Sequence, residues 1–369
     1  MSLQEEIDTT RAEIRTEGYE MSIGEWISLY ERDEIDIHPE FQRYYRWSDF
    51  QKSRLIESIL LGIPIPEIFV AQREDGVWDV VDGLQRLSTI YEFVGILKDI
   101  DGDLLPPLEL TETKYLPSLE GKKWKDPEDE EDSFNVTQRL IVKRSRIGVS
   151  IILRESDEKS KYELFQRLNT GGSPLSPQEV RNSILVMMNP DVYNWMRDLS
   201  QNEDFRECVS LTDKALQEQY DMDIVLRFIT FRTMEEEELN SIGDVNEFLT
   251  DYMIDEIAEE NFDIEEETNA FETTFGILND VMGDDSFKRY DLNKEKFLGG
   301  FLVSAFELVA LGIGYNYEYV RDSDIDLIQT IKDLWDNEEF TSNSGSGVRA
   351  STRIPRVLDL GRRTFSGDE

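Results

Sequence analysis

The chain has 369 residues, with 79 acidic and 39 basic side chains and a formal net charge of -40 at pH 7. This length allows two domains with separate cores, and the charge excludes a protein that coats nucleic acid, because affinity for DNA depends heavily on Lys and Arg at the phosphates. A single Cys excludes disulfides within the chain and a Cys-rich zinc site, and no long apolar run predicts a membrane span, so we expect a soluble cytoplasmic protein.

The first strongly periodic segment runs from Ser48 to Leu61, where apolar residues recur at helical spacing after a capping box. Gly62 is placed to end this helix. A proline-containing stretch then forces an extended chain into a hairpin with strands at 68–71 and 78–81. We therefore predict the order helix, hairpin, helix.

The second helix begins in the segment Asp82-Gly83-Leu84-Gln85-Arg86. Backbone N–H groups at a helix N-terminus lack partners inside the helix and lie at the positive end of its dipole, so a phosphate bound there gains hydrogen bonds. Arg86 adds a fork of donors, and Asp82 can cap the helix or hold a metal ion. The alternative is an ordinary turn followed by a helix cap.

Two other stretches have both a structural and a ligand-binding interpretation. Phe41 to Trp47 combines arginines with aromatic rings, which suits a ligand clamp or a purely structural anchor. Farther along, a strand at 147–153 and a helix at 158–168 lead to the Asn-Thr-Gly-Gly loop at 169–172, which is either a turn or a ligand contact. A further helix begins after Ser176, with a second capping box.

Together, four motifs in this order resemble the N-terminal domain family of GmrSD-type restriction endonucleases, over about Pro39 to Asn182. The motifs are Pro39-Glu40-Phe41-Gln42-Arg43 with Tyr45 and Trp47, Leu61-Gly62-Ile63-Pro64-Ile65-Pro66, Asp82-Gly83-Leu84-Gln85-Arg86, and Phe165-Gln166-Arg167-Leu168-Asn169-Thr170-Gly171-Gly172 with Leu175-Ser176. The resemblance implies an α+β protein in which a ParB/sulfiredoxin-like N-terminal α/β domain precedes a mainly α-helical C-terminal domain. It also implies a role in prokaryotic defence against phage or modified DNA, where this domain binds and hydrolyses nucleoside triphosphates and regulates a nuclease.

The family signature is Asp-Gly-Gln-Gln-Arg, and Leu84 stands where its first Gln is expected. If that amide positions water or a phosphate oxygen, hydrolysis is weakened while binding survives; if the position faces the core, Leu is harmless. The resemblance implies catalytic roles for Asp82, Gln85 and Arg86, with Asp82 also a candidate metal ligand. The implied nucleotide-binding residues are Arg43, Tyr45, Trp47, Gly83, Arg86, Arg167 and Asn169. The expected ligands are GTP or ATP, with CTP as a further candidate, together with Mg²⁺.

Many relatives carry a C-terminal HNH nuclease domain, whose metal and general-base chemistry needs more than one histidine. This chain has one, His38, so we expect it to lack its own HNH domain. The expected partners are a nucleotide, a separate nuclease or modification-system protein, and DNA through a limited basic region; a homo-oligomer is compatible with the sequence, and no membrane is expected. The alternatives are a non-hydrolysing ParB-like nucleotide or DNA sensor and, with less support, a ParB-fold nuclease.

We place the first domain at 21–182, with a solvated acidic insertion at 120–133, and the second at 183–369. The second domain is predicted to be helical because apolar residues recur at helical spacing in most of its length. The predicted helices are Ile184 to Met188, Val192 to Leu199, Met222 to Thr233, Val245 to Ala258, Asn269 to Val281, Lys294 to Leu311 and Ile325 to Trp335.

The C-terminal segment departs from the acidic composition, since it contains five arginines between 349 and 363 and only one acidic residue, Asp359. These arginines have three interpretations: pairing with the protein's own acidic surface, contact with nucleic-acid phosphates, or closure over a bound nucleotide. The candidate nucleic-acid contacts are Arg349, Arg353 and Arg356. The overall acidity is typical of a protein from a salt-rich cytoplasm, or of an acidic protein with solvated faces.

Overall fold

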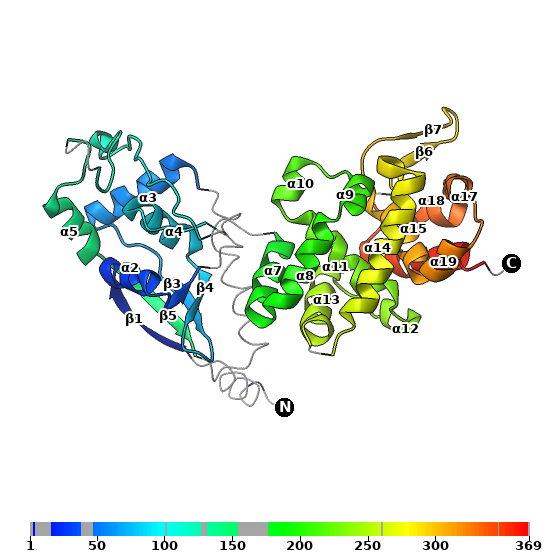
Figure 1. Cartoon of the computed structure of the whole chain (residues 1–369), viewed down its shortest axis with the longest axis horizontal. Coiled ribbons are helices and arrows are strands. Elements are labelled where there is room, and N and C mark those ends of the chain that lie inside the picture. The colour runs from blue at the N-terminus through cyan, green and yellow to red at the C-terminus, as the bar shows by residue number, and fades with distance from the viewer. Residues whose placement is uncertain are drawn as a thin grey trace. The chain divides into compact units, whose positions relative to one another are not determined.

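The computed structural model divides the chain into two units, residues 1–174 and 175–369. The structure describes Leu3 and residues 16–37, 47–99, 102–126, 131–153, 176–259, 261–345 and 347–367. The predicted α+β class is confirmed, because the first unit holds a five-stranded sheet with helices and the second is mainly helical (Figure 1). The division falls before residue 182 because helix α7 (Pro177–Met188) packs against helices of the second unit.

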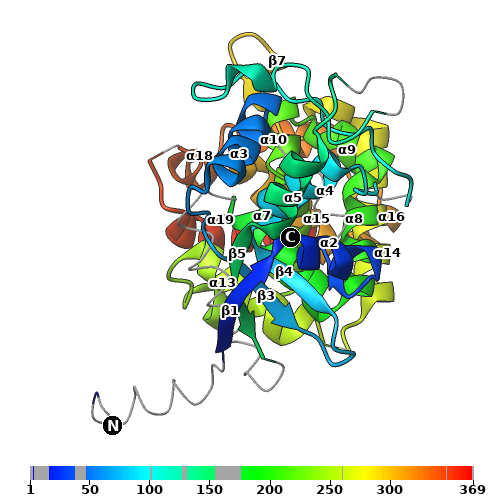
Figure 2. The same cartoon turned by 90° about the vertical axis from the view of Figure 1, so that its left-hand side faces the viewer.

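The sheet of the first unit has the strand order β1-β5-β3-β4-β2, and Figure 2 looks onto its strands. In chain order the strands are β1 (Thr16–Ser22), β2 (Ile35–Asp36), β3 (Ile68–Gln72), β4 (Trp78–Asp82) and β5 (Arg146–Ile152). The predicted hairpin is β3 and β4, which pair antiparallel, while β3 pairs parallel to β5. This mixed sheet places the end of β4 beside the central strand.

Helices of the first unit lie on one side of this sheet in Figure 1. They are α2 (Ile23–Glu31), α3 (Asp49–Leu61), α4 (Leu84–Val94) and α5 (Val136–Arg144), with a short 3₁₀ turn, η2 (Pro117–Leu119). The predicted start and end of α3 are confirmed: the Ser48 side chain accepts a hydrogen bond from the Gln51 backbone N–H, and Gly62 adopts a left-handed φ of 66°. The predicted helix at 158–168 and loop at 169–172 lie outside the described residues.

The core of this unit forms between the sheet and α4, where Leu87, Ile90 and Phe93 are fully buried. Trp124 and Phe134 join it, with ring centroids 5.6 and 5.0 Å from that of Phe93. The segment expected to be a solvated insertion is thus anchored in the core by Trp124, because burial of an indole ring removes a large apolar area from water.

The second unit is built around α11 (Tyr220–Arg232), which is buried along nearly its whole length. Before it come α7, α8 (Pro190–Gln201), α9 (Glu203–Val209) and α10 (Asp213–Gln217). After it come α12 (Glu236–Leu239), α13 (Val245–Tyr252) with a π-helical turn, η3 (Met253–Ile257), α14 (Ile264–Val281), η4 (Gly283–Asp285), β6 (Arg289–Asp291), β7 (Lys296–Leu298), α15 (Val303–Tyr315), α16 (Tyr317–Asp322), α17 (Leu327–Leu334), α18 (Glu338–Asn343) and α19 (Ala350–Phe365).

One predicted helix in this unit is wrong over part of its length. The segment predicted as a helix from Lys294 to Leu311 begins as the second strand of the β6–β7 hairpin, and α15 starts only at Val303. The Asp291 carboxylate accepts hydrogen bonds from the backbone N–H groups of Asn293 and Lys294, both at 3.0 Å, and so closes a turn. A side chain that bonds its own backbone competes with helix formation. The other predicted helices are present, with shifted ends.

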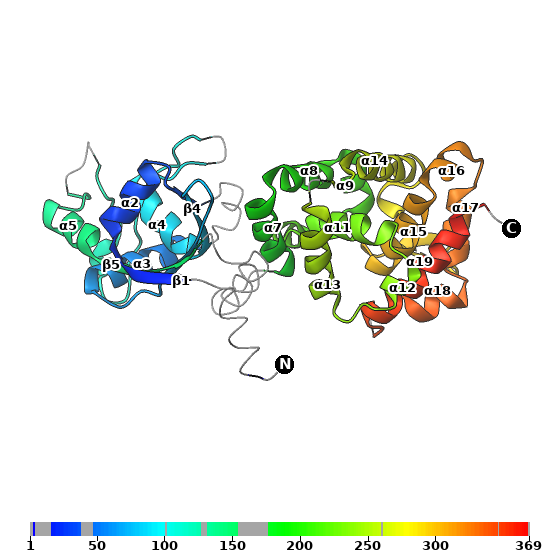
Figure 3. The same ribbon diagram turned by 90° about the horizontal axis from the view of Figure 1, so that it is seen from below.

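Helices α15 and α19 lie side by side, as Figures 1 and 3 show. Their backbones approach closely at Gly361, where an added Cβ atom would overlap the Leu308 carbonyl oxygen and lie 3.4 Å from the Gly312 Cα atom. Pro355 lies inside α19 without ending it. In the part of the chain that the structure describes, no helix is long and apolar enough to cross a membrane.

Candidate functional site

The turn after β4 requires glycine for two separate reasons. Gly83 has a φ of 107°, in the region that residues with a Cβ atom rarely adopt. An added Cβ atom would also overlap Cδ1 of Ile68, on the neighbouring strand β3. The backbone therefore turns sharply from Asp82 into α4 and packs closely against the sheet.

Arg86 and Asp82 form an ion pair at the start of α4, with 2.7 Å between Nη2 and Oδ2. The Arg86 side chain is 11% exposed and that of Asp82 is 35% exposed. The interpretation of Asp82 as the helix cap is wrong, because Gly83 is the N-cap residue and the Asp82 carboxylate accepts from Arg86 instead. The pair holds the guanidinium beside the first turn of the helix.

Leu84 is half-buried and packs against the hydrophobic core of the first unit. Of the two alternatives that the sequence left open for this position, the contact with the core favours the one in which Leu84 is harmless. Gln85 has a different role: its Oε1 atom accepts a hydrogen bond from the backbone N–H of Trp47 at 3.2 Å. Trp47 is itself half-buried against the core. The amide thus ties α4 to the end of the aromatic run.

The structure brings together part of the predicted site. Asp82, Gly83, Gln85, Arg86 and Trp47 lie at or beside the start of α4. The predicted nucleotide contacts Arg43, Tyr45, Arg167 and Asn169 lie outside the described residues, as does His38. Among the residues with described positions, no group of three His, Cys, Asp or Glu side chains could hold a metal ion, so Asp82 is not part of such a cluster there.

Sequence reasoning missed a buried ion pair that joins α3 to α4. Lys52 Nζ lies 2.9 Å from Glu92 Oε2, and the two side chains are only 11% and 14% exposed. The pair fixes the helix that carries Arg86 against its neighbour. A signal was present, since Lys52 lies on the apolar side of a predicted helix. The contact between Gln85 and Trp47 had no such signal.

The three arginines predicted to contact nucleic acid differ in burial and in hydrogen-bond partners. The assignment of Arg353 is wrong, because its guanidinium makes two hydrogen bonds, of 2.6 and 2.9 Å, to the fully buried Glu307 and is 11% exposed. Arg356 donates to the side chain of Asn343 at 3.2 Å, and Arg349 is exposed at the start of the helix.

The last two arginines of this segment also have intramolecular partners. Arg362 donates to the backbone carbonyls of Phe231, Arg232 and Met234 at the end of α11, and Arg363 pairs with Asp359 and Glu339. Of the three interpretations of this segment, pairing within the protein therefore accounts for most of the arginines.

Comparison with known proteins gives one match. The family model described as GmrSD restriction endonuclease, N-terminal domain, matches residues 23–186. No curated protein and no solved structure matches the chain. The matched segment contains β3, β4 and the turn at 82–86, and it ends inside α7. The family resemblance found from the four motifs is therefore confirmed.

Proposed function

Residues 23–186 belong to the GmrSD restriction endonuclease N-terminal domain family, and on that premise we propose a regulatory nucleoside triphosphatase. The family marks the chain as a component of a restriction or defence system. In this proposal the first unit binds and hydrolyses a nucleoside triphosphate, and a separate polypeptide cuts DNA. The observation that carries it is the Asp82–Arg86 ion pair at the start of α4.

This ion pair suits a site for a phosphate and its cation. Gly83, the N-cap residue of α4, has no side chain that could cap the helix, so an anion bound there would meet the positive end of the helix dipole. A triphosphate would replace Asp82 as the partner of Arg86. Mg²⁺ is commonly held by one or two carboxylates together with substrate phosphates, and Asp82 is exposed enough to serve.

Hydrolysis in such a site would depend on positioning and charge. Phosphoryl transfer needs little covalent help from the protein, and a guanidinium beside the transferred group stabilises its developing negative charge. Gln85 acts as a positioning residue because it holds the Trp47 backbone against α4. The packing of half-buried Leu84 against the core supports the alternative in which this departure from the family signature leaves hydrolysis intact.

A non-hydrolysing nucleotide or DNA sensor is the second candidate. It is favoured by the hydrogen bond from Trp47 to Gln85, because the signature amide that could orient water is already engaged with the backbone. A ParB-fold nuclease draws no support from the described residues, where no metal-binding group of acidic, His or Cys side chains occurs.

The test measures nucleotide binding and phosphate release with ATP, GTP and CTP, each with Mg²⁺. Arg86→Ala should lower turnover by about a hundredfold, as loss of one charge-stabilising donor commonly does. Arg32→Ala is the matched control, since the Arg32 side chain is 61% exposed, pairs with the exposed Glu34 and donates to the Ser28 backbone carbonyl within its own helix. Tight binding without phosphate release would favour the sensor. Neither binding nor release with any of the three would overturn the proposal.

A further inference from the structure

Basic and acidic residues are segregated along this chain. Between Asp132 and Glu155 the sequence has five basic residues and no acidic one, although 79 of its 369 residues are acidic. Between Arg232 and Lys288 the composition is the opposite, with nineteen acidic residues and no basic one. A surface region of one sign attracts a partner of the other sign, so the chain carries two regions that are complementary in charge.

The basic stretch contains an exposed helix, α5. Only Val142 of its nine residues is buried. Lys143 and Arg144 are exposed and form no ion pair with any residue that the structure describes, and Arg139 donates to two backbone carbonyls. No carboxylate among the described residues therefore pairs with these three cations, in a chain of net charge -40.

The same helix exposes aliphatic side chains beside its cations. Val136, Leu140 and Ile141 are each at least 40% exposed. The end of α3 packs against α5, and Leu61 and Ile63 there are exposed as well. Cations in the last turn of a helix also complement its dipole, but the dipole does not explain five exposed aliphatic side chains on adjoining elements. Exposed apolar residues that gather in this way mark protein–protein contacts.

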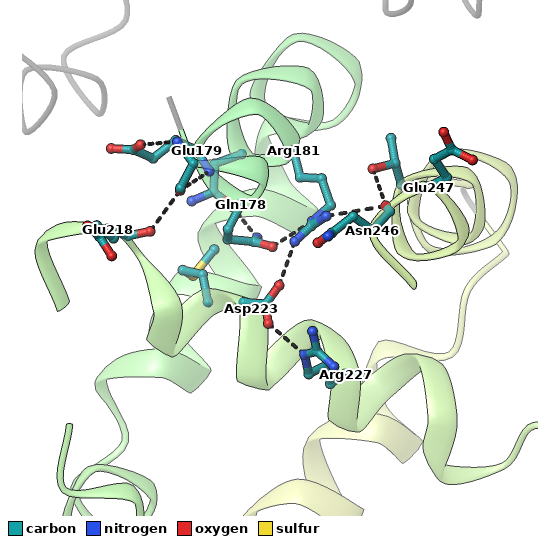
Figure 4. A network of polar contacts seen from close by, with 12 residues as sticks. Gln178, Glu179, Arg181, Glu218, Asp223, Arg227, Asn246 and Glu247 are labelled. Carbon is teal, nitrogen blue, oxygen red and sulfur yellow. Dashed lines mark hydrogen bonds and ion pairs between the residues drawn. The ribbon is translucent and has the colours of Figure 1, made fainter. Parts of the chain in front are cut away.

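The acidic stretch contains a second exposed helix, α13. Glu247 and Asp251 are exposed and four residues apart, which places them on one face of the helix. Figure 4 shows Glu247 pointing away from Arg181, whose guanidinium holds the helix by a hydrogen bond of 3.4 Å to the Asn246 carbonyl oxygen. The Phe248 ring is half-buried on the same helix. This helix thus offers carboxylates and an apolar ring to a partner.

We propose that α5 of one copy of this chain, together with the end of α3, binds α13 of a second copy. The cations of α5 would meet the carboxylates of α13, and the aliphatic side chains would pack on the Phe248 ring. Phosphates offer no apolar contact to Leu140 or Ile141, so this surface suits an acidic protein better than DNA.

The contact predicts weak, reversible self-association. Two short helices form an interface at the small end of the known range, where complexes are weak and transient. If the contact is reciprocal, it closes a dimer, and if it is not, it extends to longer assemblies. Either arrangement raises the average mass with concentration. The association does not depend on nucleotide hydrolysis in the first unit.

The test is sedimentation equilibrium of the full chain through the micromolar range, in about 0.15 M salt. The Debye length there is about 8 Å, which screens the repulsion between two acidic copies more than charges in direct contact. Arg144→Glu and Glu247→Lys should each weaken self-association at least about tenfold, because each brings like charges together. Arg321→Glu is the control, since Arg321 is exposed beside Asp322 and its reversal changes the net charge as Arg144→Glu does.

An equimolar mixture of Arg144→Glu and Glu247→Lys separates this contact from a general effect of charge. Each reversed charge meets its opposite only on the other variant, so the mixture should associate more tightly than either variant alone. Leu140→Ser keeps every charge and should weaken association severalfold through lost apolar burial, so it carries the test if Arg144→Glu does not fold.

Three results would overturn the proposal. The first is a monomer at every concentration, and the second is self-association that none of the three variants weakens. The third is a monomer that binds a DNA duplex through Arg144, which would assign the surface of α5 to nucleic acid instead.

Discussion

Replacement of Gly83 by alanine tests whether the turn before α4 is held against the sheet. The added methyl group has two costs. A residue with a Cβ atom at positive φ costs about 1–2 kcal/mol, and Gly83 has a φ of 107°. The methyl group would also overlap Cδ1 of Ile68 on β3, and overpacking of this kind costs about 1–3 kcal/mol more. The expected loss of unfolding free energy is therefore about 2–5 kcal/mol.

Gly76 provides a matched control in the same hairpin. It also has a positive φ, of 87°, but an added Cβ atom there would have no neighbour within 4 Å. Gly76→Ala should therefore lower the free energy of unfolding only by the cost of a Cβ atom at positive φ, about 1–2 kcal/mol. Urea denaturation of both variants, followed by tryptophan fluorescence, measures the difference. Ile68→Val removes Cδ1 and should recover part of the loss in Gly83→Ala. Equal losses in Gly76→Ala and Gly83→Ala, with no recovery, would refute the close packing.

Three other predictions concern charge. Burial raises the pKa of the Glu57 carboxyl, but hydrogen bonds from the Thr113 hydroxyl and two backbone N–H groups outweigh burial, so the pKa of Glu57 is lowered. The loss of unfolding free energy in Glu57→Gln should therefore be largest near pH 7. It should shrink below about pH 4.3, the ordinary pKa of Glu, where the carboxylate of the wild type becomes protonated. A difference independent of pH in urea titrations would contradict this. Arg353→Met should lower the free energy of unfolding by about 3–5 kcal/mol, because it leaves buried Glu307 without its hydrogen-bonded partner. Arg356→Met should lower it by under about 1 kcal/mol. Equal losses of unfolding free energy in urea denaturation would contradict a structural role for Arg353. Thermal unfolding should occur at a markedly higher temperature in about 1 M salt, where the Debye length is about 3 Å and the net charge of -40 is screened, and a flat response would argue against charge repulsion in the fold.

Much of the fold could be predicted from the sequence because the signals are local. The start of α3 depends on Ser48 and Gln51, three residues apart, and its end on the conformational freedom of Gly62. The start of α7 depends in the same way on Ser176 and Glu179. The turn at 82–86 follows a short strand and opens a helix, and this order alone identifies a candidate phosphate site.

Contacts between residues far apart in the chain could not be predicted in this way. The Gln85 amide meets the Trp47 backbone across 38 residues, and the Arg353 guanidinium meets Glu307 across 46. Neither contact has a sequence spacing that a helix or strand repeats. The basic composition of α19 suggested a surface for phosphates, but packing against α15 buried one of its arginines with a carboxylate.

The sequence by itself determined the ends of α3, the hairpin of β3 and β4 and the start of α7, since caps, turns and periodicity act over a few residues. It also indicated the family whose model matches residues 23–186, through motifs that occur in a fixed order along the chain. Only the tertiary structure decided that Leu84 packs against the core, that Asp82 holds Arg86, and that Arg353 is buried with Glu307. The partner of a side chain depends on which surfaces meet in space, and the buried environment then sets the cost of each unpaired charge.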